Sequence, residues 1–175
     1  MDLEKLKYPI GRFQPKDNYT LVEIEGFIDT IRSFPKLLRQ EVASLTSEQL
    51  ETPYRPEGWT IRQVVHHCAD SHMNALLRFK LTLTEDNPTI KPYKEAAFAR
   101  LDDYELPIVF SLNVIEGIHQ HWVFLLHGMS AADYERTYFH PEHQKSFDLC
   151  TALATYHWHC QHHLAHILQA KSTIA

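Results

Sequence analysis

The fold class that the sequence predicts is all-α: a four-helix bundle with long crossover connections and short extra helices. Apolar residues recur at helical spacing in four long segments, which cover residues 20–45, 60–83, 107–128 and 148–171. The connections between these segments are long and contain no convincing strand hairpin, which favours a bundle over a sheet-containing fold. One connection has the composition of a short helix near residues 95–100.

A single domain, residues 1–175, accounts for the whole chain. Its 175 residues are enough to bury a sizeable core without disulfides or other staples. No internal repeat, low-complexity segment or Gly/Ser-rich linker divides the sequence.

The first long helix begins with a Thr-x-x-Glu capping box, formed by Thr20 and Glu23. Pro35 predicts a kink or a break in this helix, because proline cannot donate the helical hydrogen bond. The preceding residues, 1–19, contain two prolines and a glycine and are expected to form an extended arm. A short helical turn is expected at residues 46–49, followed by a loop.

The other long helices also have recognisable ends. Thr60 and Gln63 form a second capping box. Pro107 suits the first turn of the next helix, and Gly128 suits its end. Asp148 has the side chain of a good N-cap for the last helix.

Composition and charge exclude several classes of function. The net charge is −5 without a basic block, which argues against nucleic acid or an anionic membrane as the main partner. There is no apolar signal region and no stretch that approaches about eighteen apolar residues, so a cytoplasmic protein is expected. Three cysteines without a C-x-x-C pair argue against a disulfide scaffold or a cysteine-based zinc site. Thirteen histidines stand out, since histidine is the commonest metal ligand.

The last helix carries an H-x-x-x-H pair, His159 and His163, on its apolar face. Residues three, four and seven apart share a helix face, and His162 falls at one edge of the apolar stripe and His157 at the other. Two imidazoles at this spacing can hold one ion, or they can be core histidines satisfied by hydrogen bonds. The stripe itself comprises Leu149, Ala152, Tyr156, Cys160, His163 and Ile167.

A third ligand is available from either of two other helices. His67 lies on a narrow polar strip of the second long helix, which lines an internal cavity or faces solvent. His119 points inward from the third long helix, with Glu116 beside it as a possible proton acceptor. Periodicity alone does not choose between them. The polar strip comprises Thr60, Gln63, His67, Asp70, Ser71, Asn74 and Arg78.

Residues 138–147, YFHPEHQKSF, are predicted to be a loop that leaves His140 and His143 solvated. This segment and the connection at residues 85–106 shape any pocket, and the sequence does not predict how they fold.

Two motifs, GWTIRQVVHHCADSHMN (58–74) and YHWHCQHHLAHI (156–167), resemble the DinB-like superfamily of four-helix bundles. They resemble more closely its YfiT-type branch, which is described as metal-dependent hydrolases and includes bacillithiol transferases. YPIGRF (8–13), TPYRPEGWT (52–60) and RFKLTLTE (78–85) are similar to the same branch, so the resemblance covers nearly the whole chain.

The resemblance implies which residues hold the metal. The histidine of the W-[ST]-x6-H segment corresponds to His67, and the distal pair corresponds to His159 and His163. It makes His119 a pocket-lining candidate and implies a homodimer. The remaining implied neighbours of the site are His66, His162 and His166.

Three neutral imidazoles leave one divalent ion with open positions for water or substrate. Such ligands suit zinc or nickel, with iron or manganese as further candidates. The leading hypothesis is an enzyme of small molecules, either a thiol S-transferase that uses a low-molecular-weight thiol or a hydrolase. Neither motif contains a glutamate that would supply a general base. The residues expected to position substrate are Gln63, Asp70, Asn74, Arg78 and His119.

Two alternatives stay open. The first is a non-catalytic metal-binding or stress-response module with a structural ion, for which Cys68, Cys160 or His119 would supply a fourth ligand. The second is a helical domain whose histidines bind no metal.

Overall fold

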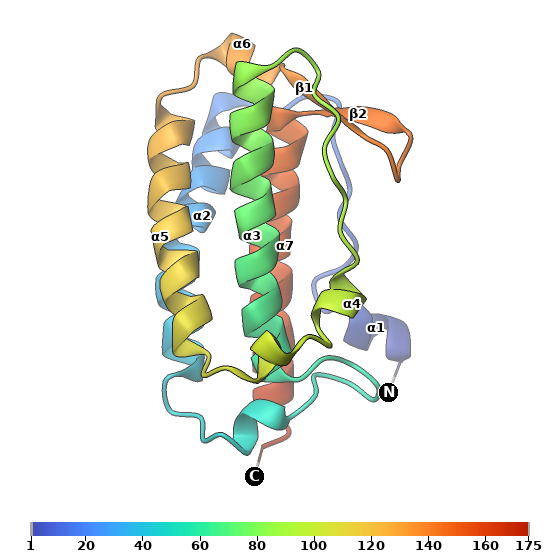
Figure 1. Cartoon of the computed structure of the whole chain (residues 1–175), viewed down its shortest axis with the longest axis vertical. Coiled ribbons are helices and arrows are strands. Elements are labelled where there is room, and N and C mark those ends of the chain that lie inside the picture. The colour runs from blue at the N-terminus through green and yellow to red at the C-terminus, as the bar shows by residue number, and fades with distance from the viewer. Residues whose placement is uncertain (1, 175) are drawn as a thin grey trace.

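The computed structural model describes residues 2–174 and confirms the helical bundle (Figure 1). Met1 and Ala175, the ends of the predicted domain, lie outside the described residues. No helix in the described range is both long and apolar enough to cross a membrane. The bundle helices are α2 (Leu21–Val42), α3 (Ile61–Thr84), α5 (Val109–His127) and α7 (Leu149–Lys171).

The four helices form a ring in which α2 and α3 each pack against both α5 and α7. The chain descends along α2 and ascends along α3 (Figure 1). It then returns outside the bundle, so that α5 ascends parallel to α3 and α7 descends parallel to α2. The long crossover between α3 and α5 therefore runs along the outside of α3, where it can cover the polar strip.

Helix boundaries follow the expected caps. Both predicted capping boxes are formed, at Thr20 and at Thr60, and Asp148 accepts a hydrogen bond from the Thr151 amide at the start of α7. Of the kink or break predicted at Pro35, the break is wrong, because α2 continues through this residue. Packing of the apolar face of α2 onto α5 and α7 keeps this helix continuous despite one missing backbone bond.

Short elements complete the chain. The extended arm expected at the N-terminus contains one helical turn, which Asp2 caps by accepting a hydrogen bond from the Glu4 amide. The short turn expected near residue 49 and the short helix expected near residue 95 are both present. These elements are α1 (Leu3–Lys7), η1 (Gln49–Glu51), α4 (Glu95–Phe98), η2 (Asp102–Glu105) and α6 (Ala131–Tyr134).

A β-hairpin replaces the loop expected at residues 138–147. Its strands, β1 (Thr137–His140) and β2 (Lys145–Asp148), pair antiparallel around a four-residue turn. The crossover adds to this pairing, since the Ile90 amide donates to the Phe139 carbonyl and the Phe139 amide donates to the Pro88 carbonyl. The strands are only four residues long and depend on this distant segment, so local sequence patterns do not reveal them.

The polar strip of α3 faces the protein interior rather than solvent. His67 and Ser71 are buried, whereas Met73 and Leu77, which appear apolar in sequence, are 51% and 54% exposed. The crossover therefore covers the polar side of α3 and leaves part of its apolar side open to solvent. That inversion indicates that the buried part of the strip, around His67 and Ser71, lines a site.

Candidate metal centre

A cavity of about 580 Å³ lies between α3 and α7, beside the predicted metal ligands. The hairpin and α4 contribute to its wall, together with Tyr8 of the N-terminal arm. Trp59, at the end of the loop before α3, contributes an aromatic side, and Tyr156 of α7 contributes another. This volume is in the usual range for a small-molecule site.

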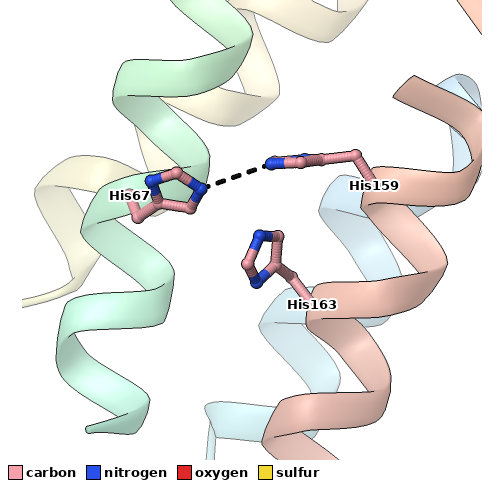
Figure 2. Close-up of side chains that lie close together, drawn as sticks. All are labelled: His67, His159 and His163. Atoms are coloured by element: carbon pink, nitrogen blue, oxygen red, sulfur yellow. Dashed lines mark hydrogen bonds between the residues drawn. The ribbon is translucent and has the colours of Figure 1, made fainter. Parts of the chain in front are cut away.

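The structure brings together the three histidines that the family resemblance implied. His67 projects from α3, and His159 and His163 project from successive turns of α7 (Figure 2). One ring nitrogen from each lies within 4.8 Å of the others. The Nε2 atoms of His67 and His159 are 3.3 Å apart.

This separation fits two ligands of one ion. Zinc–imidazole bonds of about 2.0–2.1 Å at a tetrahedral angle place two ligand nitrogens about 3.3–3.4 Å apart. The observed 3.3 Å between His67 and His159 falls at this value. In Figure 2, a ring nitrogen of His163 points into the gap between the other two rings. The donor set and its spacing therefore fit a divalent ion.

Burial keeps these imidazoles neutral, as metal binding requires. Desolvation lowers the pKa of His67 to about 4. It also lowers the pKa of His159 and of His163 well below the ordinary value, and the neighbouring histidines add to the effect. At pH 7 each ring therefore has one nitrogen with a free lone pair.

The W-[ST]-x6-H spacing has a structural reason. Thr60 begins α3, and the indole of Trp59, just before this cap, packs against the His67 ring two turns later with a centroid distance of 4.7 Å. Ser71, one turn further along α3, places its hydroxyl 3.5 Å from His159 Nε2. The motif thus fixes both the start of the helix and the orientation of one candidate ligand.

Arg78 is the one predicted substrate-positioning residue that lines the cavity. Its Nε is buried and has no hydrogen-bond partner within the described part of the chain. Burial first, and then the charges of His143 and Arg78, lower the pKa of His140. A guanidinium held in this way favours an anionic ligand group.

Gln63, Asp70 and Asn74 do not line this cavity. Gln63 donates to the Ala99 carbonyl at 3.0 Å, and Asp70 accepts from the Tyr104 hydroxyl at 2.7 Å. Asn74 donates to the backbone carbonyl of Asp70. The hydrogen bonds of Gln63 and Asp70 hold the crossover against α3, which shapes the cavity without contacting its contents.

Glu116 and His119 also lie away from the cavity. Glu116 is on the outer face of α5, where it forms an ion pair with Arg39 at 3.0 Å. His119 is 1% exposed and lies behind His72, which separates it from the candidate ligands. Neither residue is therefore placed to exchange a proton with a substrate in the cavity.

The three expected neighbours of the site differ in position. His66 bonds Ser111 and the Leu106 carbonyl, which ties α3 to the start of α5 rather than to the site. His162 lines the cavity and stacks on Trp158, with a centroid distance of 4.3 Å. His166 approaches His163 from the side opposite the cavity, with their Nδ1 atoms 3.5 Å apart.

The sequence did not predict His140 and His143 as site residues. It placed both in a solvated loop, whereas the hairpin carries them over the cavity and leaves His140 only 8% exposed. Their rings lie 4.5 Å apart. The strand-favouring run Thr137, Tyr138 and Phe139 was the available signal, but three residues are too few to predict a strand.

Comparison with known proteins agrees with this architecture. The profile of the DinB superfamily matches residues 31–167. A protein of Oceanobacillus iheyensis (strain HTE831) named "Putative metal-dependent hydrolase" is 51% identical over 161 residues, covering 92% of this chain and 93% of that protein. A Bacillus pumilus (strain SAFR-032) protein of the same name is 47% identical over 167 residues, 95% of each chain.

The solved structure of YfiT from Bacillus subtilis superposes on this chain with a TM-score of 0.94 and 40% sequence identity. The match covers 96% of this chain and 97% of that one. YfiT is described as "a probable metal-dependent hydrolase with an unusual four-helix bundle topology". The parallel pairs α3–α5 and α2–α7 arise from the long crossover of the present chain (Figure 1). This chain belongs to the DinB superfamily.

Proposed function

We propose that this protein is a metal-dependent enzyme of small molecules, in which His67, His159 and His163 hold one divalent ion, zinc or nickel. The observation that carries the proposal is the convergence of three neutral imidazoles at the wall of a cavity large enough for a substrate. Structural zinc sites close all four positions with protein ligands, whereas catalytic sites keep one open.

The alternative of a structural ion requires a fourth protein ligand. Among residues 2–174, the group around the candidate site contains His67, His159 and His163, and a second group, His162, His163 and His166, shares His163 with it. Neither group contains a cysteine or a carboxylate. Cys68 and Cys160 are buried thiols, and burial raises the pKa of both, which opposes thiolate formation. His119 is separated from the group by His72. These positions favour the catalytic interpretation.

The charge of the site favours an anionic reactant. A divalent ion bound there would lower the pKa of a coordinated thiol or water. Its three imidazole ligands are neutral, so they would not offset its charge. The cavity wall also carries Arg78, which is half-buried, and one carboxylate, Glu95, which is exposed. We therefore propose that Arg78 binds a carboxylate or phosphate group of the substrate.

Between the two reactions, thiol transfer fits the cavity better. The one carboxylate on its wall is Glu95, which is exposed on α4, so no buried carboxylate accompanies the histidines as a base. A thiolate needs no further base for attack. Its sulfur forms a bond to the electrophilic carbon, the leaving group departs with the bonding electrons, and the thiol proton passes to solvent. The names of the relatives support hydrolysis as the second candidate.

Assays of metal-reconstituted protein distinguish thiol transfer from hydrolysis. Chelated and dialysed protein, reloaded with zinc or nickel, is mixed with cysteine and 1-chloro-2,4-dinitrobenzene, and adduct formation is compared with hydrolysis of p-nitrophenyl acetate. Metal-dependent adduct formation supports transfer, and metal-dependent ester hydrolysis alone supports the second candidate. Stoichiometric metal without either activity would overturn the enzymatic proposal for these substrate classes.

Arg78 is tested in the same assay. Arg78→Gln is expected to raise KM for cysteine about ten- to hundredfold, because hydrogen bonds to charged groups contribute about 1.5–3 kcal/mol. The same variant should leave KM for cysteamine, which lacks the carboxylate, unchanged. Lys80→Gln, on the exposed side of α3, is the matched control. An equal effect of Arg78→Gln on both thiols would contradict the proposed carboxylate contact.

A further inference from the structure

The buried polar contacts behind the candidate ligands begin at a proline. Pro35 lies inside α2 and has no amide hydrogen, so the carbonyl of Ile31, four residues earlier, lacks its helical donor. His119 of α5 fills this position, with its Nδ1 hydrogen-bonded to the Ile31 oxygen. A carbonyl oxygen can only accept. His119 Nδ1 must therefore carry the hydrogen.

This assignment propagates along a row of histidines. In a neutral imidazole one nitrogen donates and the other accepts, so His119 Nε2 is an acceptor. It lies 2.7 Å from His72 Nδ1, which must therefore donate. His72 Nε2 is then an acceptor, and it lies 3.1 Å from His159 Nδ1.

The row ends at the candidate metal site. His159 Nδ1 carries the hydrogen, so the lone pair of His159 is on Nε2. That atom is the one 3.3 Å from His67 Nε2. His72 and His119 are 0% and 1% exposed, and Phe34 packs against both rings at centroid distances of 5.3 and 5.6 Å. Such burial shields the hydrogen bonds of the row from solvent.

A shorter row lies behind His163. His166 Nε2 donates to the carbonyl of Lys7, the last residue of α1, at 3.1 Å. His166 Nδ1 is then an acceptor, and His163 Nδ1 lies 3.5 Å from it. The Tyr54 ring stacks on His166 at 3.8 Å and fixes its plane. The remaining nitrogen of His163, Nε2, points toward the other two candidate ligands (Figure 2).

We infer that two buried hydrogen-bond relays, Ile31–His119–His72 and Lys7–His166, fix the tautomers of His159 and His163 so that both Nε2 lone pairs face the ion. This inference rests on the proposed metal site and adds positioning residues to it. Each relay is anchored on a carbonyl without an intrahelical donor, in one case because of Pro35 and in the other because α1 ends. Partners of this kind orient metal-binding histidines in proteins generally.

Long-range 1H–15N correlation spectra of the metal-free protein test the relays directly. We expect the Nδ1–H tautomer for His119, His72, His159 and His163, and the Nε2–H tautomer for His166. Addition of zinc should shift the Nε2 resonances of His159 and His163 while both keep Nδ1–H. An Nε2–H tautomer at His72 or His159 in the metal-free protein would overturn the longer relay.

Zinc affinity of variants gives the second test. His72→Phe removes the acceptor for His159 Nδ1–H, and we expect zinc binding to weaken about ten- to hundredfold. His159 should then show mixed tautomers. His66→Phe is the control, because His66 is also a buried, hydrogen-bonded histidine of the same helix but belongs to neither relay. Equal zinc affinity in His72→Phe and wild type would overturn the positioning role.

The results of these two tests separate a failure of the relays from a failure of the proposed metal site. If His72→Phe does not fold, the wild-type spectra alone decide the tautomers. The predicted tautomers in a protein that binds no zinc or nickel would uphold the relays and refute the proposed function. Bound metal with other tautomers would refute the relays and leave the proposed function standing.

Discussion

Acidification should destabilise the metal-free protein strongly, because its interior contains histidines that must stay neutral. Burial lowers the pKa of His119 to about 4, from an ordinary value of 6.5, and desolvation lowers the pKa of His67 to the same value. The unfolded chain therefore binds more protons than the folded chain between pH 6.5 and 4. The stabilisation from each group is complete above pH 6.5 and is lost as the pH falls through this window.

The magnitude follows from the two pKa values. A histidine with a pKa of 6.5 when unfolded and about 4 when folded loses about 2 kcal/mol between pH 7.5 and 5. His67 and His119 together should thus cost about 4 kcal/mol, a large share of a typical stability of about 5–15 kcal/mol. His72, His159 and His163 shift in the same direction and increase the loss.

Urea unfolding of chelated protein, followed by circular dichroism at intervals between pH 7.5 and 5, measures this loss. His119→Leu should reduce the pH dependence by up to one proton, or about 1.4 kcal/mol per pH unit. His121→Leu, on the exposed side of the same helix, should leave it unchanged. A free energy of unfolding that is constant from pH 7.5 to 5 would refute the buried-neutral description of these histidines.

Three further predictions concern the crossover, the ion and the outer surface. Tyr104→Phe removes the hydrogen bond to Asp70 and should lower the free energy of unfolding by about 1–3 kcal/mol, as measured by urea unfolding. Zinc affinity, measured by titration, should not change. Zinc at a hundredfold excess over Kd should raise the free energy of unfolding by about 2.7 kcal/mol, and calorimetry without such a gain would contradict tight binding to the folded state. An exposed apolar row on α5 is formed by Phe110, Val114 and Phe124, which are 56%, 43% and 84% exposed. If the expected homodimer forms through this row, Phe124→Glu should convert it to a monomer, as measured by light scattering.

The bundle and its helix ends could be predicted from sequence because the signals are local. Capping boxes at Thr20 and Thr60 need only four consecutive residues, and helical spacing assigns His159 and His163 to one face. The choice of His67 over His119 as the third ligand could not be made from such local signals. Both point inward, and the family resemblance rather than periodicity chose His67; the structure then places it, and not His119, beside the distal pair.

The unpredicted parts depend on contacts between distant segments. The hairpin that carries His140 over the cavity pairs with the crossover near residues 88–90. Helical spacing places His72 among the apolar residues of α3, and its role as a link between His119 and His159 requires three helices to be placed together. Pro35 did mark a helix carbonyl without a donor, but the sequence did not show which side chain supplies one.

Metal content of purified protein tests the central claim most directly. We predict about one zinc or nickel ion per chain in wild type by elemental analysis after dialysis, and near-complete loss in His163→Ala. His157→Ala is the matched control, since His157 is on the same helix but bonds Thr30 of α2, and it should retain the ion. Unchanged metal content in His163→Ala, or wild-type protein that binds no ion after reconstitution, would contradict the three-histidine site.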